Sequence, residues 1–330
     1  MLLTCENRGV NCQAMHTQVL KIEALSSLYV IGIILGYPII ITVSLVAHIF
    51  QLLVKFVKSR FGHSKSIAGE VALVTGAGHG LGRDIAIALA QQGCHIAVVG
   101  TQVKYLLETS AFIAQTFGVK TKAYKVDVTN YQQICELKEN VSKDLGDVTI
   151  LINNAGVIYM STKEKPSAEV VQRMINVNLT GTTLVTDVFL PKMKELNRGH
   201  IVNVSSASVF FPLPIHYIYG STKAAMRYLT AALRVHLRQI KSNVKATCLM
   251  PSYLTTNKGV SEDMKATGIT PGQFQIDGDV LAQYVIKALH WGHEEIAVPC
   301  GFLWVQKLSA IFPAYIQEFS LTLLSRTLKK

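Results

Sequence analysis

The chain has 330 residues, of which 49% are hydrophobic, and its 32 Lys and Arg against 21 Asp and Glu give a formal net charge of +11. This length fits one large α/β domain with appendages or two small domains, and the hydrophobic content indicates contact with lipid. The positive charge suits a membrane surface or an anionic cofactor. The sequence carries no zinc-binding or nucleic-acid-binding signature, so we expect neither a metal nor a nucleic-acid partner.

Residues 1–66 are predicted to be an N-terminal tail with a membrane anchor. Residues 28–47 form an uncharged apolar stretch of the length that spans a bilayer as a helix. The stretch begins too late, and lacks the basic flank, for a signal peptide. Pro38 would kink a helix, so a re-entrant hairpin is the alternative to a single span. The basic residues that follow place the rest of the chain in the cytosol: Lys55, Lys58, Arg60 and Lys65.

Residues 67–300 alternate short apolar runs with helical patterns. The runs are near-continuously apolar, as expected of parallel strands that are covered on both faces. Seven strands are predicted, at residues 70–75, 95–100, 122–127, 148–153, 200–205, 244–250 and 294–299. Helices are predicted between them, for example over 81–92, 170–190 and 221–238. The alternation predicts an α/β domain of Rossmann type, a doubly wound parallel sheet.

A glycine-rich turn, "TGAGHGLG", follows the first predicted strand and precedes a helix. Thr75, Gly76, Gly80 and Gly82 frame it. Such a turn directs free N–H groups at a phosphate, and glycine lets the pyrophosphate approach the backbone closely. The alternative is a tight turn without a ligand.

The tip of the second strand reads Val-Gly-Thr-Gln at residues 99–102, without the acid that would bind an adenosine ribose. Nothing there repels a 2′-phosphate. Thr101 could donate a hydrogen bond to it, and Lys104, His79 or Arg83 could add positive charge. NADP(H) is therefore the preferred cofactor and NAD(H) the alternative.

The stretch "HYIYGSTKAA" holds two tyrosines before one lysine. Tyr219 and Lys223 are four residues apart and share one helix face. A nearby ammonium favours the phenolate, so we expect it to lower the pKa of Tyr219. Tyr217 falls elsewhere on the helix and is expected to line a pocket. Ser205 and Ser206 end a strand where ligands of such sheets bind.

Residues 301–330 are predicted to be an amphipathic, membrane-associated C-terminal tail. Pro313 divides it into two segments. Tyr315, Phe319 and Leu323 recur at a spacing of four and form an apolar stripe. We favour a pair of interfacial helices over a tail that covers the core.

The ordered motifs resemble those of the short-chain dehydrogenase/reductase family, over about residues 68–258. They are "TGAGHGLG", "DV", "NNAG", "NVNLTG", "VSSAS", "YGSTK" and "MPSYLTT". Within the family, "GDVTILINNAG" and the apolar extensions look like the membrane-associated retinol dehydrogenase and 17β-hydroxysteroid dehydrogenase-like branch.

This resemblance implies a role for each matching residue. Ser206 would hold the substrate oxygen, Tyr219 would be the acid/base, and Lys223 would bind the nicotinamide ribose. Asn178 would position a water in a proton relay, with Asn176 as the alternative. The implied cofactor contacts are Thr75, Gly76, Gly80, Leu81, Gly82, Thr101, Asp127, Val128, Asn154, Ala155, Gly156, Tyr219, Lys223, Pro251, Leu254 and Thr256.

The implied activity is that of a membrane-bound oxidoreductase, which interconverts an apolar alcohol and its aldehyde or ketone by hydride transfer. A retinoid, a steroid or another lipid would bind Ser206, Phe210, Phe211 and Tyr217, although both phenylalanines could instead pack in the core. We expect a homo-oligomer on the endoplasmic reticulum membrane or a lipid droplet, with the catalytic domain in the cytosol. A catalytically silent cofactor-sensing or scaffold protein is the alternative.

Overall fold

The computed structural model describes residues 46, 50, 66–159, 165–212, 214–255, 275–310 and 312–327. The chain divides into two compact units, residues 1–64 and 65–330. The predicted span at 28–47 lies, except for residue 46, outside the described residues. Within the described part, no helix is long and apolar enough to cross a membrane.

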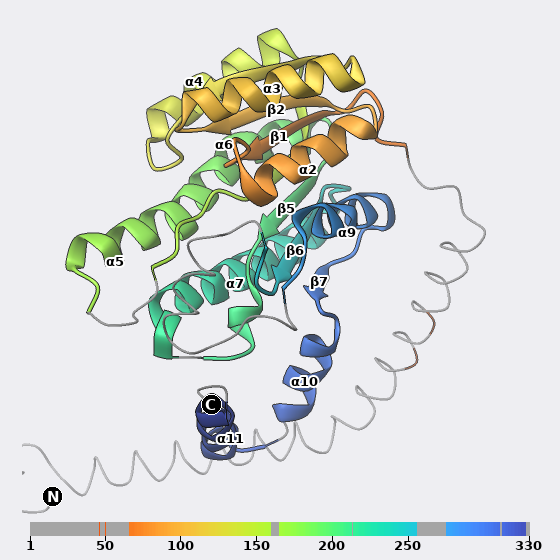
Figure 1. Ribbon diagram of the computed structural model, residues 1–330. Coiled ribbons are helices and arrows are strands. Elements are labelled where there is room, and N and C mark those ends of the chain that lie inside the picture. Colours follow the sequence, from red (N-terminus) through yellow and green to blue (C-terminus); the bar gives the residue numbers. More distant parts are fainter. Residues whose placement is uncertain are drawn as a thin grey trace, which may run out of the picture. The chain divides into compact units, whose positions relative to one another are not determined.

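The second unit is built on a seven-stranded sheet whose neighbouring strands are all parallel, which confirms the predicted Rossmann-type fold (Figure 1). The strand order is β3-β2-β1-β4-β5-β6-β7. The order reverses between β1 and β4, and ligands of such sheets bind beyond the strand ends at this point. The strands are β1 (Val71–Thr75), β2 (His95–Gly100), β3 (Thr121–Lys125), β4 (Val148–Asn153), β5 (His200–Val204), β6 (Lys245–Pro251) and β7 (Glu295–Val298).

Helices cover both faces of the sheet because successive strand residues point to opposite sides. Ala72 and Val74 of β1 pack into one apolar core, and Val71 and Leu73 pack into the other. The first core is completed by α2 (Gly80–Gln91), α3 (Val103–Phe117) and α9 (Gly278–Trp291). The second is completed by α4 (Tyr131–Asp144), α6 (Thr182–Glu195) and α7 (Tyr217–Gln239).

The helix predicted over 170–190 is interrupted by a π-helical turn. The segment consists of α5 (Ala168–Ile175), the π turn η2 (Asn176–Gly181) and α6. At Gly181 a Cβ atom would lie 2.7 Å from the side chain of Val128, so the backbones approach closely there. Turns of this type are frequent at functional sites.

The C-terminal part continues from β7 into α10 (Gly301–Ser309) and α11 (Ala314–Thr327). Two short 3-10 turns, η3 (Ala207–Val209) and η4 (Pro214–His216), lead into α7.

Arg227 of α7 joins three of these elements. Its Nε and Nη2 atoms each donate to the carboxylate of Glu295 in β7 at 2.9 Å. Its Nη1 atom donates to Gln306 of α10 at 2.7 Å. The guanidinium also lies 5.3 Å from the ring centroid of Phe210. Arg227 therefore fixes α10 against the helix that carries Tyr219.

We expect Arg227→Ala to lower the free energy of unfolding by about 2–3 kcal/mol, because each hydrogen bond to a charged group contributes on this scale. Urea denaturation of the full chain in detergent measures it. Arg238→Ala is the matched control, since its ion pair with Glu294 is 62% and 53% exposed and should contribute under about 1 kcal/mol. An equal loss in both variants would contradict the role of Arg227.

The contribution of Arg227 to the free energy of unfolding should also depend on pH. Burial raises the pKa of Glu295, but Arg227 and Arg234 lower it more, so the pKa lies below its ordinary value. A lowered folded-state pKa gives stability that is present above the unfolded pKa, about 4.3, and is lost as pH falls through the folded pKa. The difference between wild type and Arg227→Ala should therefore shrink in acid.

Candidate active site

A cavity of about 1610 Å³ lies at the carboxyl ends of the strands. Most of the predicted site residues line it: Gly76, Gly80, Leu81, Gly82, Thr101, Asp127, Val128, Asn154, Ala155, Gly156, Ser206, Phe211, Tyr219, Lys223, Pro251 and Leu254. Four predicted residues do not line it, namely Thr75, Asn178, Phe210 and Tyr217. Thr256 lies outside the described residues.

The glycine turn forms one end of the cavity. Gly76 and Gly80 have φ angles of +68° and +55°, a region that favours glycine. At Gly82 a Cβ atom would lie 2.2 Å from the carbonyl oxygen of Gly76 and 2.5 Å from Nδ2 of Asn154. A side chain therefore cannot fit where the first turn of α2 meets the loop, and the helix N-terminus is left open to a phosphate.

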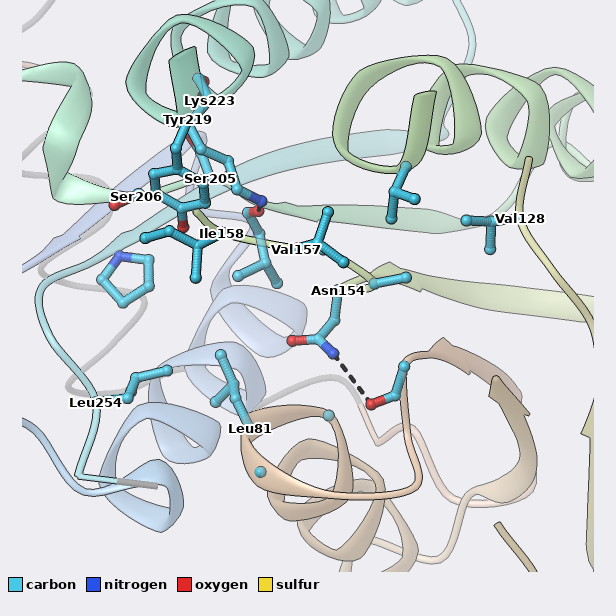
Figure 2. Close-up of a pocket in the computed structure, with 18 of the residues that line it drawn as sticks. Leu81, Val128, Asn154, Val157, Ile158, Ser205, Ser206, Tyr219, Lys223 and Leu254 are labelled. Atoms are coloured by element: carbon cyan, nitrogen blue, oxygen red, sulfur yellow. Dashed lines mark hydrogen bonds between the residues drawn. The ribbon is translucent and has the colours of Figure 1, made fainter. Parts of the chain in front are cut away.

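Thr75 positions this turn from behind the cavity wall. Its buried hydroxyl donates to the Ile152 carbonyl at 3.3 Å and accepts the backbone N–H groups of Asn154 and Ala155, each at 3.0 Å. Asn154 in turn donates its amide to the carbonyls of Thr75 and Gly76, and Figure 2 shows it turned toward the glycine turn. These bonds tie the end of β4 to the end of β1.

Of the three residues predicted to add positive charge on the adenosine side, one lines the cavity. His79 lines the cavity, whereas Lys104 and Arg83 do not. The Arg83 guanidinium lies 5.2 Å from the ring centroid of Phe112 instead. Asp127 lines the cavity, and its carboxylate accepts the N–H and hydroxyl of Thr129 at 2.9 and 2.8 Å.

The side of the cavity opposite the glycine turn brings together Tyr219, Ser206 and Lys223 (Figure 2). A hydrogen bond joins the Ser206 hydroxyl to the Tyr219 phenol. The Lys223 ammonium is 5.7 Å from the centroid of the Tyr219 ring and donates to the Val204 carbonyl at 2.8 Å. The neighbouring Ser205 instead donates to the Lys223 carbonyl at 2.7 Å, which leaves Ser206 as the serine beside the phenol.

The pKa values of this cluster are set by burial. Burial raises the pKa of Tyr219 to about 12, against a lowering effect of the Ser206 hydrogen bond. Burial lowers the pKa of Lys223 to about 8. The expectation that the pKa of Tyr219 is lowered is wrong, because desolvation of the phenolate dominates. At neutral pH the phenol holds its proton.

Asn178 lies behind the wall and acts on the backbone. Its Oδ1 accepts the N–H of Val157 at 2.8 Å, and its Nδ2 donates to the Val157 carbonyl at 2.9 Å and to the Thr222 hydroxyl at 3.1 Å. A Cβ atom at Gly156 would lie 3.3 Å from Asn178 and 3.4 Å from the Lys223 ammonium. The amide thus lies close to the lysine and holds the loop after β4 beside α7.

The substrate end of the cavity differs from the predicted pocket. Phe211 lines it together with Phe302, and the two rings are 5.1 Å apart. Phe210 is 8% exposed and packs in a core with Cys248, Met250 and Ala297. Tyr217 is 52% exposed, because it is two residues before Tyr219 and points to a different side of α7.

Several lining residues were not singled out from the sequence, although Ser208, His216 and Tyr253 lie in the segments 207–217 and 253–276 that the sequence predicts to form the substrate pocket. They come from η3, η4, the loop after β6 and the C-terminal helices: Ser208, His216, Tyr253, Phe302 and Leu321. An apolar stripe at helical spacing predicts a buried or interfacial face but does not show which helix reaches the cavity.

We expect Gly82→Ala to weaken cofactor binding, because its methyl group would displace the glycine turn or the Asn154 amide. Titration of NADPH against the purified full chain, followed by protein fluorescence, should show at least a tenfold weaker Kd. Gly301→Ala is the control, since a Cβ atom there meets nothing within 4 Å. Unchanged affinity in Gly82→Ala would contradict this account of the turn.

The chain is similar to known dehydrogenases in sequence and in structure. The model of the short chain dehydrogenase family matches residues 70–265. Human 17-beta-hydroxysteroid dehydrogenase 13 is 33% identical over 219 residues, 66% of this chain and 72% of the relative. Human estradiol 17-beta-dehydrogenase 11 is 32% identical over 229 residues, 69% of this chain and 74% of the relative.

Two solved structures share the fold. A Burkholderia phymatum short chain dehydrogenase/reductase in complex with NAD has a TM-score of 0.67 and 24% identity, over 74% of this chain and 94% of that one. An alcohol dehydrogenase from Thermococcus sibiricus, complexed with 5-hydroxy-NADP, has a TM-score of 0.60 and 28% identity, over 69% and 95% of the chains. The chain belongs to the short-chain dehydrogenase/reductase family and is a nicotinamide-dependent oxidoreductase that acts on CH–OH groups.

Proposed function

We propose that this protein is a membrane-bound reductase of apolar ketones or aldehydes, with NADP(H) as its preferred cofactor and Tyr219 as its proton donor. The observation that carries the proposal is the placement of the Tyr219 phenol, hydrogen-bonded to Ser206, in the same cavity as the glycine turn. A scaffold protein without catalysis has no need of this arrangement.

A nicotinamide cofactor held by the glycine turn and Lys223 would supply the hydride for the carbonyl carbon. Tyr219 gives its proton to the carbonyl oxygen, and its high pKa keeps that proton available at neutral pH. Ser206 hydrogen-bonds the same oxygen and orients it. As the phenol becomes a phenolate, the ammonium of Lys223, whose Nζ lies 5.7 Å from the centroid of the ring, stabilises the charge. Oxidation of the alcohol reverses these steps, with the phenolate as base.

The preference for NADP(H) is supported by the residues around the tip of β2. Residues 99–102 contain no acid, and Thr101 and His79 both line the cavity there. A hydroxyl and an imidazole accommodate a 2′-phosphate that a carboxylate would repel. NAD(H) is the alternative, and with it alcohol oxidation becomes the expected direction.

The substrate is proposed to be a largely apolar lipid. Beside the glycine-turn residues, the cavity is lined by the apolar or aromatic side chains of Phe211, Phe302, Tyr253 and Leu321. The names of the two human relatives make steroids the first compounds to test, with retinoids and fatty carbonyls beside them.

We expect Tyr219→Phe to lower kcat by at least 10²-fold while the Kd for NADPH changes little, because the phenyl ring keeps the shape and loses the proton. Reduced-nicotinamide absorbance is followed with NADPH and with NADH over a steroid, retinoid and fatty-carbonyl panel. Tyr217→Phe is the matched control and should retain wild-type activity, since Tyr217 does not line the cavity.

Near-normal turnover by Tyr219→Phe would refute the assignment of the proton donor. No oxidation of either cofactor by wild type with any compound would favour the scaffold reading. A higher kcat/KM with NADH than with NADPH would overturn the cofactor preference.

We further propose that the protein lies on the endoplasmic reticulum membrane, or on a lipid droplet, with the catalytic unit in the cytosol. The apolar stretch at 28–47 is the proposed anchor. Large apolar side chains of the C-terminal segment are at least half exposed, which supports a second contact with lipid: Trp304, Val305, Leu308, Phe312, Tyr315 and Phe319.

If the C-terminal segment contacts lipid, a chain without residues 1–64 should still float with phosphatidylcholine vesicles on a density gradient. Trp304→Asp with Leu308→Asp and Phe319→Asp should abolish flotation, because charge opposes insertion of this surface. The same number of aspartates at exposed, uncharged positions of α4, namely Tyr131, Gln132 and Asn140, is the control. A truncated wild-type chain that remains with the soluble fraction would contradict this membrane contact.

A further inference from the structure

Two polar side chains in the cavity wall have no part in the proposed chemistry. Ser208 belongs to η3 and His216 belongs to η4, and both line the cavity that holds Tyr219. Their neighbours in the substrate end are apolar, with Phe211 and Phe302 foremost. A polar pair in an apolar wall is the usual means by which a pocket fixes the orientation of a ligand.

Both side chains are unsatisfied within the described part of the chain. His216 is 5% exposed, and its Nδ1 atom has no hydrogen-bond partner there. The buried Oγ atom of Ser208 has none either. Most buried polar atoms of folded proteins are paired, so two unpaired atoms in one wall point to a ligand that pairs them. Both atoms are covered in this structure, so the two side chains must turn toward the cavity when such a ligand binds.

The two groups lie close to each other and to the reacting groups. A Cβ atom at Gly220 would lie 3.7 Å from Nδ1 of His216 and 3.9 Å from Cβ of Ser208, which places both around one point. The Ser208 backbone N–H donates to the Ser206 hydroxyl at 3.1 Å. The His216 ring is 6.4 Å from the Tyr219 ring, edge to face. A substrate group bound here is therefore near the reacting carbon.

The chemistry of the pair selects a neutral oxygen. Burial lowers the pKa of His216, so its imidazole is uncharged at pH 7. A neutral imidazole and a hydroxyl can each donate and accept one hydrogen bond. They match an alcohol or a carbonyl, and they give a carboxylate or phosphate no opposite charge in exchange for its desolvation.

We propose that Ser208 and His216 form a second polar subsite, which binds an uncharged hydroxyl or carbonyl oxygen one or two carbons from the carbon that reacts. The subsite rests on the proposed function and narrows its substrate to apolar lipids with two neighbouring oxygen functions, such as a hydroxyketone or a diol. Ser206 and Tyr219 take the reacting oxygen, and Ser208 and His216 take the second.

The test compares three ketones of one chain length with the full-length enzyme and NADPH: 2-decanone, 1-hydroxy-2-decanone and 10-hydroxy-2-decanone. The subsite predicts that kcat/KM for the 1-hydroxy compound exceeds that for 2-decanone by about tenfold, the ratio expected of one added hydrogen bond. The 10-hydroxy compound has the same polarity with its hydroxyl at the far end, and it should gain nothing.

Ser208→Ala and His216→Leu should each bring the ratio between the 1-hydroxy compound and 2-decanone close to one. Ser208→Ala removes a single oxygen and guards against misfolding of the histidine variant. Ser142→Ala is the control, because this serine of α4 bonds Asp147 away from the cavity and should leave the ratio at its wild-type value.

Equal kcat/KM for the three ketones, or a preference that survives in both variants, would overturn the subsite. Calorimetry of the same ketones binding to the NADP⁺-loaded chain distinguishes the absence of the subsite from a failure of the proposed function. If no ketone is reduced but the 1-hydroxy compound binds more tightly to wild type than to Ser208→Ala, the subsite stands and the reductase does not. Equal affinities would remove the subsite whatever the turnover.

Discussion

The candidate active site depends on one buried ammonium. Lys223 is 3% exposed and donates to the carbonyl of Val204, the last residue of β5. This bond attaches α7 to the strand end, and it places Tyr219, one turn earlier, over the cavity. Burial brings the pKa of Lys223 down to about 8, so the group is still mostly charged at neutral pH and can stabilise a phenolate as it forms.

Polar side chains behind the wall hold the groups in front of it. Thr75 joins β1 to the chain after β4, and Asn178 joins that same chain to α7 through Val157 and Thr222. The side chains of Thr75 and Asn178 form all or most of their possible hydrogen bonds with other groups of the protein. Because these bonds are buried, they fix the geometry of the site with little freedom left. The π turn that contains Asn178 is what brings its amide to Val157.

The C-terminal helices connect the cavity, an exposed apolar surface and the catalytic helix. Phe302 and Leu321 line the cavity, while large apolar side chains of the same helices are exposed. Arg227 attaches α10 to the catalytic helix through Glu295 and Gln306. In the proposed function, one segment therefore both shapes the apolar pocket and contacts lipid. The bonds of Arg227 therefore hold α10, which carries the lining residue Phe302, against α7.

The sequence by itself determined the strands, the glycine turn and the spacing of Tyr219 and Lys223. All of these depend on short-range geometry, in which strand periodicity, the steric needs of glycine and one helical turn act over a few residues. Only the tertiary structure decided that Phe211 lines the cavity while Phe210 packs in the core, and that the phenol pKa is raised. Burial is the reason, because it is set by residues that are distant in the chain.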